Sequence, residues 1–465
     1  MRVRTRLTLV TLVSGATLFL YLFYSTPDYA SADPVASNRR RYRQLHRRAP
    51  PPNFDAWTAH AASQQCLTDP SAYAQIYADL APWLRRSTVA AGSTQPVFGT
   101  MQVRFNGTGF EWGASPYNNA DPALFDSLAH LLPAKEFRFL VNLFDEPRVV
   151  PADDGAAVPY RDMDNVFERN TCFRRQFGTP GPHAGLSEAL RAVTSEGESI
   201  RSQHGFLLHP DSFVVENMRF PLFSNAKTEC FDDIVIPLHY HYFFADPPVH
   251  DPIPWEAKQT VLFWRGATTG GKLSLDTPWR KYGRIRLMQW LQSVWMPKHP
   301  GSTFDASQEQ APLLAQNLSV DLGFNEIVQE YNPEISEAIE REFGLKGRVE
   351  FDKAVRFKYL LVVDGNSWPS RLQQYLQTNS VVLYNGIFTD FYTANLKPMV
   401  HYVPIKLDYS DLEEKMDWLQ QHDEEAQKIV QNAQELLRKW GNMNQMRCYI
   451  ALLLLEYSNL FKSEE

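Results

Sequence analysis

Short apolar runs alternate with stretches of helical periodicity from about residue 71 to the C-terminus. A strand buried on both faces is apolar throughout, whereas a surface helix repeats its apolar residues every three or four positions. The chain therefore predicts alternating strands and helices, an order typical of parallel sheets covered by helices on both faces. The segments that carry the strands are 137–147, 232–244, 259–272, 359–365, 380–386 and 401–405.

The length of the chain predicts two domains. Its 465 residues exceed what one hydrophobic core usually serves. The Pro-rich segment 246–254 is the candidate linker, so we expect an N-terminal domain over 71–250 and a C-terminal domain over 251–465. The apolar spacing in residues 410–461 predicts three closing helices.

The N-terminus predicts a membrane anchor. Residues 7–24 contain no charged residue and follow Arg2, Arg4 and Arg6. As a helix this stretch would be about 27 Å long, close to the hydrocarbon thickness of a bilayer. We therefore expect a cytosolic tail (1–6), a transmembrane signal-anchor (7–24) and a lumenal body, as in a single-pass type II protein of the Golgi rather than the endoplasmic reticulum. A cleaved signal peptide is the alternative, because Ala30-Ser31-Ala32 resembles a cleavage site.

Charge is distributed unevenly along the chain. Residues 1–50 hold nine Arg and two Asp, a net +7, so the overall charge of −7 leaves −14 on the remainder. An acidic body argues against nucleic acid as a partner, and any bound anion must be held by a local site. The Arg- and Pro-rich residues 25–70 predict an extended or disordered stem.

The cysteines show no zinc-binding spacing. In an oxidising lumen one or two disulfides are expected, with three full pairings possible, and buried free thiols are the alternative. Two glycosylation sequons, at Asn106 and Asn317, fit a lumenal body. The four cysteines are Cys66, Cys172, Cys230 and Cys448.

The first polar group at a strand end is Arg265. It follows the apolar residues 261–264, and Gly266, Gly270 and Gly271 come next. An arginine, accessible backbone N–H groups and a helix start near Thr277 would form an anion site. A purely structural turn is the alternative.

The second group follows the strand that ends at residue 363. Asp364-Gly365-Asn366 predicts a turn, and Arg371 lies in the first turn of the helix after it. One interpretation is an ion pair between Arg371 and Asp364 or Asp390. The other is a diphosphate bound by the guanidinium group together with the helix end.

The third group is Asp145, at the end of the strand in "FRFLVNLFDEP". A carboxylate at this place in a cleft can serve as a general base. Alternatively Asp145 caps the next segment or pairs with Arg148. Asp162-Met163-Asp164 has the spacing of a metal-binding motif, but no apolar strand precedes it, so no metal is expected there.

These motifs resemble glycosyltransferase family 90, which contains fungal capsule-associated xylosyltransferases and animal protein O-glucosyltransferases. The resemblance covers roughly residues 130–460, and its most specific part is Asp-Gly-Asn-x-x-x-x-Arg at 364–371. Further matching stretches are "FWRGATTGG", "SVVLYNG", "LKPMVHYVPI" and "DLEEKMDWL".

The resemblance implies a GT-B fold, in which two Rossmann-like domains face each other across a cleft and the C-terminal one binds a nucleotide-sugar. It also implies an inverting transfer of xylose or glucose from a UDP-sugar, without a metal or other cofactor, to a hydroxyl group of a glycan or protein. Asp145 would be the base, and Asp232 and Asp233 match an acidic position of unassigned role. The glucosyltransferases carry Ser after the Arg-Gly, whereas Ala267 stands here, which favours xylose. The implied donor-binding residues are Arg265, Gly266, Asp364, Gly365, Asn366 and Arg371, flanked by Trp264 and Trp368.

Two other classes of protein remain open. A catalytically inactive lumenal protein that binds sugars or serves quality control would be free to lose Asp145. A membrane-anchored hydrolase with paired carboxylates would need two acids in one cleft and no nucleotide site, whereas Arg265 and Arg371 favour a nucleotide site.

Overall fold

The computed structural model describes most of the chain after residue 33. The described residues are 34–84, 98–114, 121–151, 153, 167–177, 186–195, 197–209, 220–245, 248–307 and 318–461.

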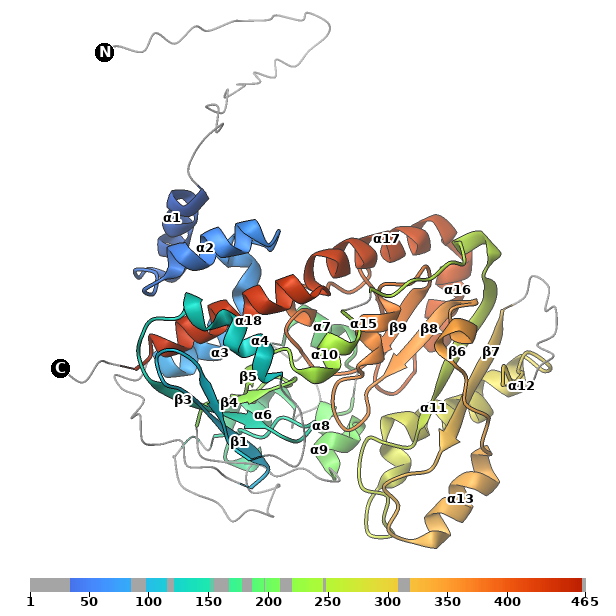
Figure 1. The fold of residues 1–465 in the computed structure, drawn as a ribbon. Coiled ribbons are helices and arrows are strands. Elements are labelled where there is room, and N and C mark those ends of the chain that lie inside the picture. The colour runs from blue at the N-terminus through green and yellow to red at the C-terminus, as the bar shows by residue number, and fades with distance from the viewer. Residues whose placement is uncertain are drawn as a thin grey trace, which may run out of the picture.

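Two five-stranded sheets form the framework (Figure 1). The first has the order β2-β1-β3-β4-β5, and the second has the order β10-β9-β8-β6-β7. We call the elements around these sheets the N-terminal lobe and the C-terminal lobe. The strands are β1 Thr100–Phe105, β2 Phe110–Trp112, β3 Phe137–Asn142, β4 Leu222–Ser224, β5 Ile234–Val235, β6 Gln259–Ala267, β7 Ser319–Glu326, β8 Phe357–Val363, β9 Val381–Asn385 and β10 Val403–Pro404.

Helices connect and cover these strands. In the first half of the chain they are α1 Pro34–His46, α2 Phe54–Ser63, α3 Ala74–Leu84, α4 Pro122–Leu128, α6 Thr171–Gln176, α7 Glu188–Ala192, α8 Ile200–Gln203, α9 Gly205–Leu208 and α10 His239–Phe243. In the second half they are α11 Gly283–Trp290, α12 Met296–Lys298, α13 Pro333–Phe343, α14 Phe351–Ala354, α15 Arg371–Tyr375, α16 Leu412–Gln421, α17 Asp423–Trp440 and α18 Met443–Ser458.

The prediction of an α/β fold with parallel sheets is confirmed. All strand pairs of the second sheet are parallel, as are β3–β4 and β4–β5 in the first. Alternate residues of β6 enter different cores, with Phe263 in one and Leu262 and Trp264 in the other, so both faces of this sheet are covered. The first sheet differs from the expectation at one edge, where β1 pairs antiparallel with β2 and β3. The GT-B arrangement itself stays a prediction.

The three closing helices lie where the periodicity of residues 410–461 predicts them. The last two run in succession across both lobes, since α17 contacts β9 and α18 contacts α2 and α4 (Figure 1). Tyr449 Oη donates to the Val235 carbonyl at 3.2 Å, and Tyr457 Oη donates to the Arg138 carbonyl at 2.7 Å. The C-terminal helix therefore completes the core of the N-terminal lobe.

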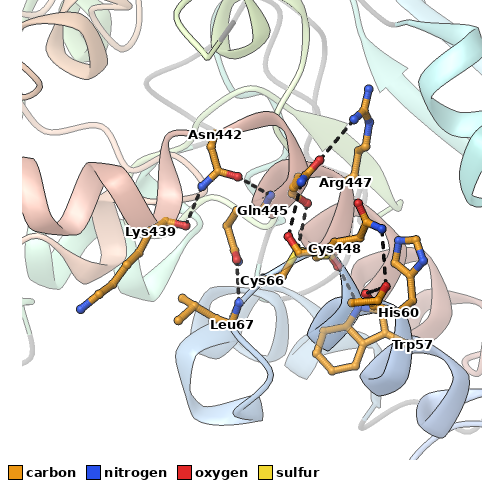
Figure 2. The surroundings of a disulfide bond; sticks show 12 residues. Trp57, His60, Cys66, Leu67, Lys439, Asn442, Gln445, Arg447 and Cys448 are labelled. Atoms are coloured by element: carbon orange, nitrogen blue, oxygen red, sulfur yellow. Dashed lines mark hydrogen bonds between the residues drawn. A yellow bond between two sulfur atoms is a disulfide. The ribbon is translucent and has the colours of Figure 1, made fainter. Parts of the chain in front are cut away.

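The expectation of an extended stem over residues 25–70 is wrong for residues 34–70. Helices α1 and α2 form there, and Tyr42, Phe54 and Trp57 are buried in the core that includes α18. Trp57 Nε1 donates to the Cys448 carbonyl at 2.9 Å (Figure 2). A local sequence pattern could not predict this packing, because Trp57 packs against helix α18, almost 400 residues further along the chain.

The predicted membrane anchor is corrected. Within the described ranges, no helix combines the length and the apolar character needed to cross a bilayer. Residues 7–24, where the transmembrane helix was expected, and the tail 1–6 lie outside the described residues. The structure therefore does not support an N-terminal transmembrane helix or the single-pass type II placement that depended on it.

The four cysteines form two disulfides, which resolves the three pairings left open by the sequence. Cys172–Cys230 lies within the N-terminal lobe, and Cys66–Cys448 joins the segment after α2 to α18 (Figure 2). Beside the Cys66–Cys448 bridge, the Leu67 N–H donates to Gln445 Oε1 at 2.9 Å. This bridge ties the two ends of the described chain together.

Replacing both Cys66 and Cys448 by Ser is expected to lower the free energy of unfolding by several kcal/mol. The bridge spans 382 residues, and the entropy that a cross-link removes from the unfolded chain grows with the loop it closes. Cys172→Ser/Cys230→Ser is the matched control, because its 58-residue span predicts a loss smaller by about 1.5 kcal/mol. Urea unfolding would measure both, and a larger loss for the control would contradict the prediction.

Candidate active site

A cavity of about 240 Å³ lies between the two lobes. It is smaller than pockets that enclose a whole drug-sized ligand, which are about 300–1,000 Å³, so it fits the reacting groups of a larger substrate. The N-terminal lobe contributes Asp145 and Tyr240 to its wall. The C-terminal lobe contributes Thr269, Arg284, Gly365, Asn366, Ser367, Trp368, Pro369, Ser370 and Arg371.

The turn after β8, residues 364–366, contributes to the wall of the cavity. The Asp364 carboxylate points away from the cavity and accepts hydrogen bonds from Tyr384 Oη at 2.9 Å and the Ile387 N–H at 2.7 Å. His204 Nε2 lies 3.3 Å from the same carboxylate. Asp364 therefore fixes the turn to the neighbouring strand and to the N-terminal lobe, while Gly365 and Asn366 line the cavity.

Arg371 opens α15 and lines the cavity, as the sequence predicts. Its guanidinium group donates to the Arg265 carbonyl. The alternative of an ion pair with Asp364 or Asp390 is wrong, because these carboxylates lie against His204 and His241. Among the described residues, no carboxylate lies within ion-pair distance of Arg371.

A second arginine, Arg284, lines the same cavity and was missed by the sequence analysis. It lies in the first turn of α11, which begins at Gly283, whereas a short 3-10 helix, Trp279–Lys281, begins near Thr277 as expected. Arg284 donates to the Asp364 carbonyl at 3.0 Å, the Ala267 carbonyl at 2.9 Å and Thr269 Oγ1 at 2.6 Å. Across the described ranges, its hydrogen-bond partners are neutral oxygens.

The electrostatics of the cavity follow from these two cations. Burial, and then the nearby charge of Arg371, lower the pKa of Arg284 to about 10. The Arg284 side chain also lies 5.8 Å from the centroid of the Trp264 ring, which is buried in the core. Two neighbouring guanidinium groups that, among the described residues, have no carboxylate within ion-pair distance attract an anion, and a diphosphate matches their donor geometry.

Arg265 does not line this cavity. The structure places its guanidinium group in a buried cluster, with Nη2 2.8 Å from Asp321 on β7 and 3.1 Å from Asp305. Lys346 Nζ lies 2.6 Å from Asp321 in the same cluster. Gly323 provides the space, since a Cβ there would lie 2.6 Å from Arg265 Nη1. Asp321 stands within the apolar run of β7, and a buried aspartate there could have indicated that a neighbouring strand supplies its cation, which is Arg265.

Two loops of the C-terminal lobe are held tightly together beside the arginines. The Gly270 N–H donates to Asn366 Oδ1 at 3.0 Å, and Gly270 has φ +127°, a conformation that favours glycine. A Cβ on Gly365 would lie 2.8 Å from Thr269 Oγ1 and 3.0 Å from Arg284 Nη2. Glycine at position 365 therefore lets the turn approach the arginine, while Gly266 packs against Trp264.

Asp145 lies in a turn after β3 that is stabilised by hydrogen bonds of Asn142 and Asp233. Asn142 Nδ2 donates to the Glu146 carbonyl at 2.7 Å, and the buried Asp233 carboxylate accepts the Arg148 and Val149 N–H groups at 3.0 and 2.7 Å. These contacts give Asp233 a positioning role that the sequence could not assign. Surrounding protein, which excludes water from the carboxylate, raises the pKa of Asp145.

The remaining wall carries a hydroxyl group and an aromatic ring. Ser367 is 3% exposed, and its Oγ has no hydrogen-bond partner in the described part of the chain. Trp368 stacks on His241 with ring centroids 5.6 Å apart and planes 11° apart. His239 and His241, which the sequence placed on a strand, lie instead on helix α10.

No group of three or more His, Cys, Asp or Glu side chains within the described ranges is arranged to hold a metal ion. Asp162-Met163-Asp164 lies outside the described residues.

Comparisons with known proteins find similarity to one family model and to several sugar transferases. Residues 292–465 match the family model described as glycosyl transferase family 90. Protein O-glucosyltransferase 2 of Danio rerio is 36% identical over 113 residues, which are 24% of this chain and 23% of that protein. Human protein O-glucosyltransferase 3 is 35% identical over 121 residues, 26% of this chain and 24% of that protein. Human protein O-glucosyltransferase 1 is 32% identical over 104 residues, 22% of this chain and 26% of that protein.

These alignments span about a quarter of each relative. The family match includes the cavity residues Gly365 to Arg371, whereas Asp145, Tyr240 and Arg284 precede it.

Arg265→Ala and Arg371→Ala are expected to affect folding differently. Removing Arg265 leaves Asp321 buried with Lys346 as its remaining cation, so we expect a loss of about 3 kcal/mol. Removing Arg371 takes away a cation that repels Arg284, so the loss should stay below about 1 kcal/mol. Urea unfolding of the two variants is the measurement, and equal losses would contradict the different placement of the two arginines.

Proposed function

Residues 292–465 match the model of glycosyl transferase family 90, and from this match we propose that the protein transfers a sugar from a UDP-sugar to an acceptor hydroxyl group. One observation carries the proposal. Arg284 and Arg371 face one cavity without a carboxylate partner among the described residues, and Asp145 faces the same cavity from the opposite lobe. An anion-binding wall opposite a base is the arrangement that a transfer with a diphosphate leaving group requires.

The donor's diphosphate would lie against the two guanidinium groups. Negative charge grows on the diphosphate as the bond from the anomeric carbon to its oxygen breaks, and fixed cationic donors stabilise that charge. The unpartnered Ser367 hydroxyl group can donate one more hydrogen bond there. In this proposal the arginines supply the positive charge that a divalent cation supplies in other sugar transferases.

The acceptor would enter from the side of Asp145. The carboxylate takes the proton of the acceptor hydroxyl group while that oxygen forms a bond to the anomeric carbon, and UDP departs with the electron pair of the broken bond. A single displacement inverts the anomeric centre. The raised pKa of Asp145 makes it a stronger base than an ordinary aspartate.

Two observations bear on which sugar is transferred, and they point to different sugars. The relatives named above are O-glucosyltransferases, whereas Ala267 follows Arg265-Gly266 in this chain and favours xylose by the family pattern. We propose xylose or glucose as the transferred sugar. The alternative of an inactive sugar-binding protein is less favoured, because Asp145 lines the cavity and the turn that carries it is held by hydrogen bonds of Asn142.

Binding of UDP tests the anion site. Arg371→Ala and Arg284→Ala should each weaken UDP about 10- to 100-fold, because each removes charge-assisted hydrogen bonds of about 1.5–3 kcal/mol. Arg286→Ala, which removes a cation of the same helix outside the cavity wall, is the matched control and should leave the affinity unchanged. Titration calorimetry with UDP, with and without EDTA, is the measurement. Unchanged affinity in both cavity variants, or UDP binding and turnover abolished by EDTA, would refute the proposed site.

The pH dependence of transfer tests the base. Asp145 acts when deprotonated, so activity should fall as the pH drops through its pKa, and that pKa is raised above the usual value of about 3.9. The acidic limb of kcat/KM should therefore lie at a higher pH than an ordinary aspartate would give. Asp145→Asn should bind UDP normally and lose transfer by orders of magnitude. Retained transfer in Asp145→Asn would assign the base to another group.

A further inference from the structure

Helix α10 carries an aromatic surface to the rim of the cavity. Tyr240 and Phe243 are 46% and 71% exposed, and residues three apart lie on the same face of a helix. Tyr240 belongs to the cavity wall, and among the described residues Asp145 is the other contribution of the N-terminal lobe. The Tyr240 ring meets Trp368 at a centroid distance of 6.0 Å and an angle of 69°, so the two rings form a corner.

The opposite face of α10 is fixed to both lobes. His241 Nδ1 accepts the Leu238 N–H at 3.3 Å, and His241 Nε2 lies 3.4 Å from Asp390. The His241 carbonyl accepts from Gln373 on α15 at 3.2 Å. The exposure of Tyr240 is thus not a sign of a loosely held segment, because the residue next to it is buried and bonded.

The phenol group is held in its neutral form. The charge of Asp145, and then burial, raise the pKa of Tyr240, so its hydroxyl group keeps its proton. A neutral phenol beside the proposed base can donate a hydrogen bond to a second oxygen of the acceptor. The same side chain therefore presents a flat apolar face and a polar tip at one place.

We infer that Tyr240 and Trp368 form the acceptor subsite, that Phe243 extends it, and that the acceptor is a pyranose ring. This inference rests on the proposed function and deepens it. A pyranose has a C–H face that packs against the face of an aromatic ring, and it carries hydroxyl groups adjacent to the one that reacts. The serine or threonine of a protein acceptor offers one hydroxyl group and no flat face, so this corner fits it poorly.

Kinetics of transfer to simple acceptors test the subsite. The full chain would be assayed with UDP-xylose or UDP-glucose against methyl hexopyranosides, matching disaccharides and a serine-containing peptide. Tyr240→Ala should raise the KM for the glycoside about three- to tenfold, while the affinity for UDP stays unchanged. Tyr240→Phe should recover part of the loss, and Phe243→Ala should impair the disaccharide more than the monosaccharide.

Tyr331→Ala is the control, since Tyr331 is an exposed tyrosine outside the cavity wall. An unchanged glycoside KM in Tyr240→Ala, transfer to the peptide in preference to every glycoside, or no use of any glycoside would overturn the subsite. Failure of the proposed function looks different, because the wild-type chain would then not bind UDP.

Discussion

Two positive charges that repel each other inside a cavity between the lobes are the constraint on which this site depends. Arg284 and Arg371 are kept in place by carbonyl and hydroxyl oxygens, which orient a guanidinium group without neutralising it. The turn beside them requires glycine at position 365, because a Cβ there would clash with Thr269 and Arg284. Such an arrangement does not add to the stability of the fold, because the two charges repel each other and no ion pair within the described ranges offsets that repulsion.

The carboxylates that could neutralise these arginines are engaged elsewhere. Asp364 and Asp390 each lie against a histidine of the N-terminal lobe, and Asp321 lies against Arg265 and Lys346. The contacts of Asp364 and Asp390 with histidines of the N-terminal lobe therefore also keep these two carboxylates out of ion pairs with the arginines. Asp145 remains as the acid that faces it, and its turn is braced by Asp233 from beneath.

The sequence predicts what depends on local pattern. Six of the ten strands, the Asp-Gly-Asn turn, the position of Arg371 and the strand-end Asp145 follow from apolar runs and turn residues, whereas β1, β2, β4 and β7 were not predicted. It does not separate Arg265 from Arg284, because that choice depends on Asp321, which pairs from a neighbouring strand 56 residues further on. The helices of residues 34–63 were missed for a related reason. Their polar sequence becomes helical where Tyr42 and Trp57 can bury themselves against α18, a surface that no local window contains.

The bridge between Cys66 and Cys448 makes a covalent ring of nearly everything between the first and the last helices. A protease that cuts one surface loop inside this ring opens the circle but releases no fragment, because both pieces stay attached through sulfur. Loops within 172–230 lie inside both rings, so the Cys172–Cys230 bridge alone would also hold their pieces together after a cut. A single nick would thus become visible as two chains only after reduction, and the lobes around the cavity would stay connected in the meantime.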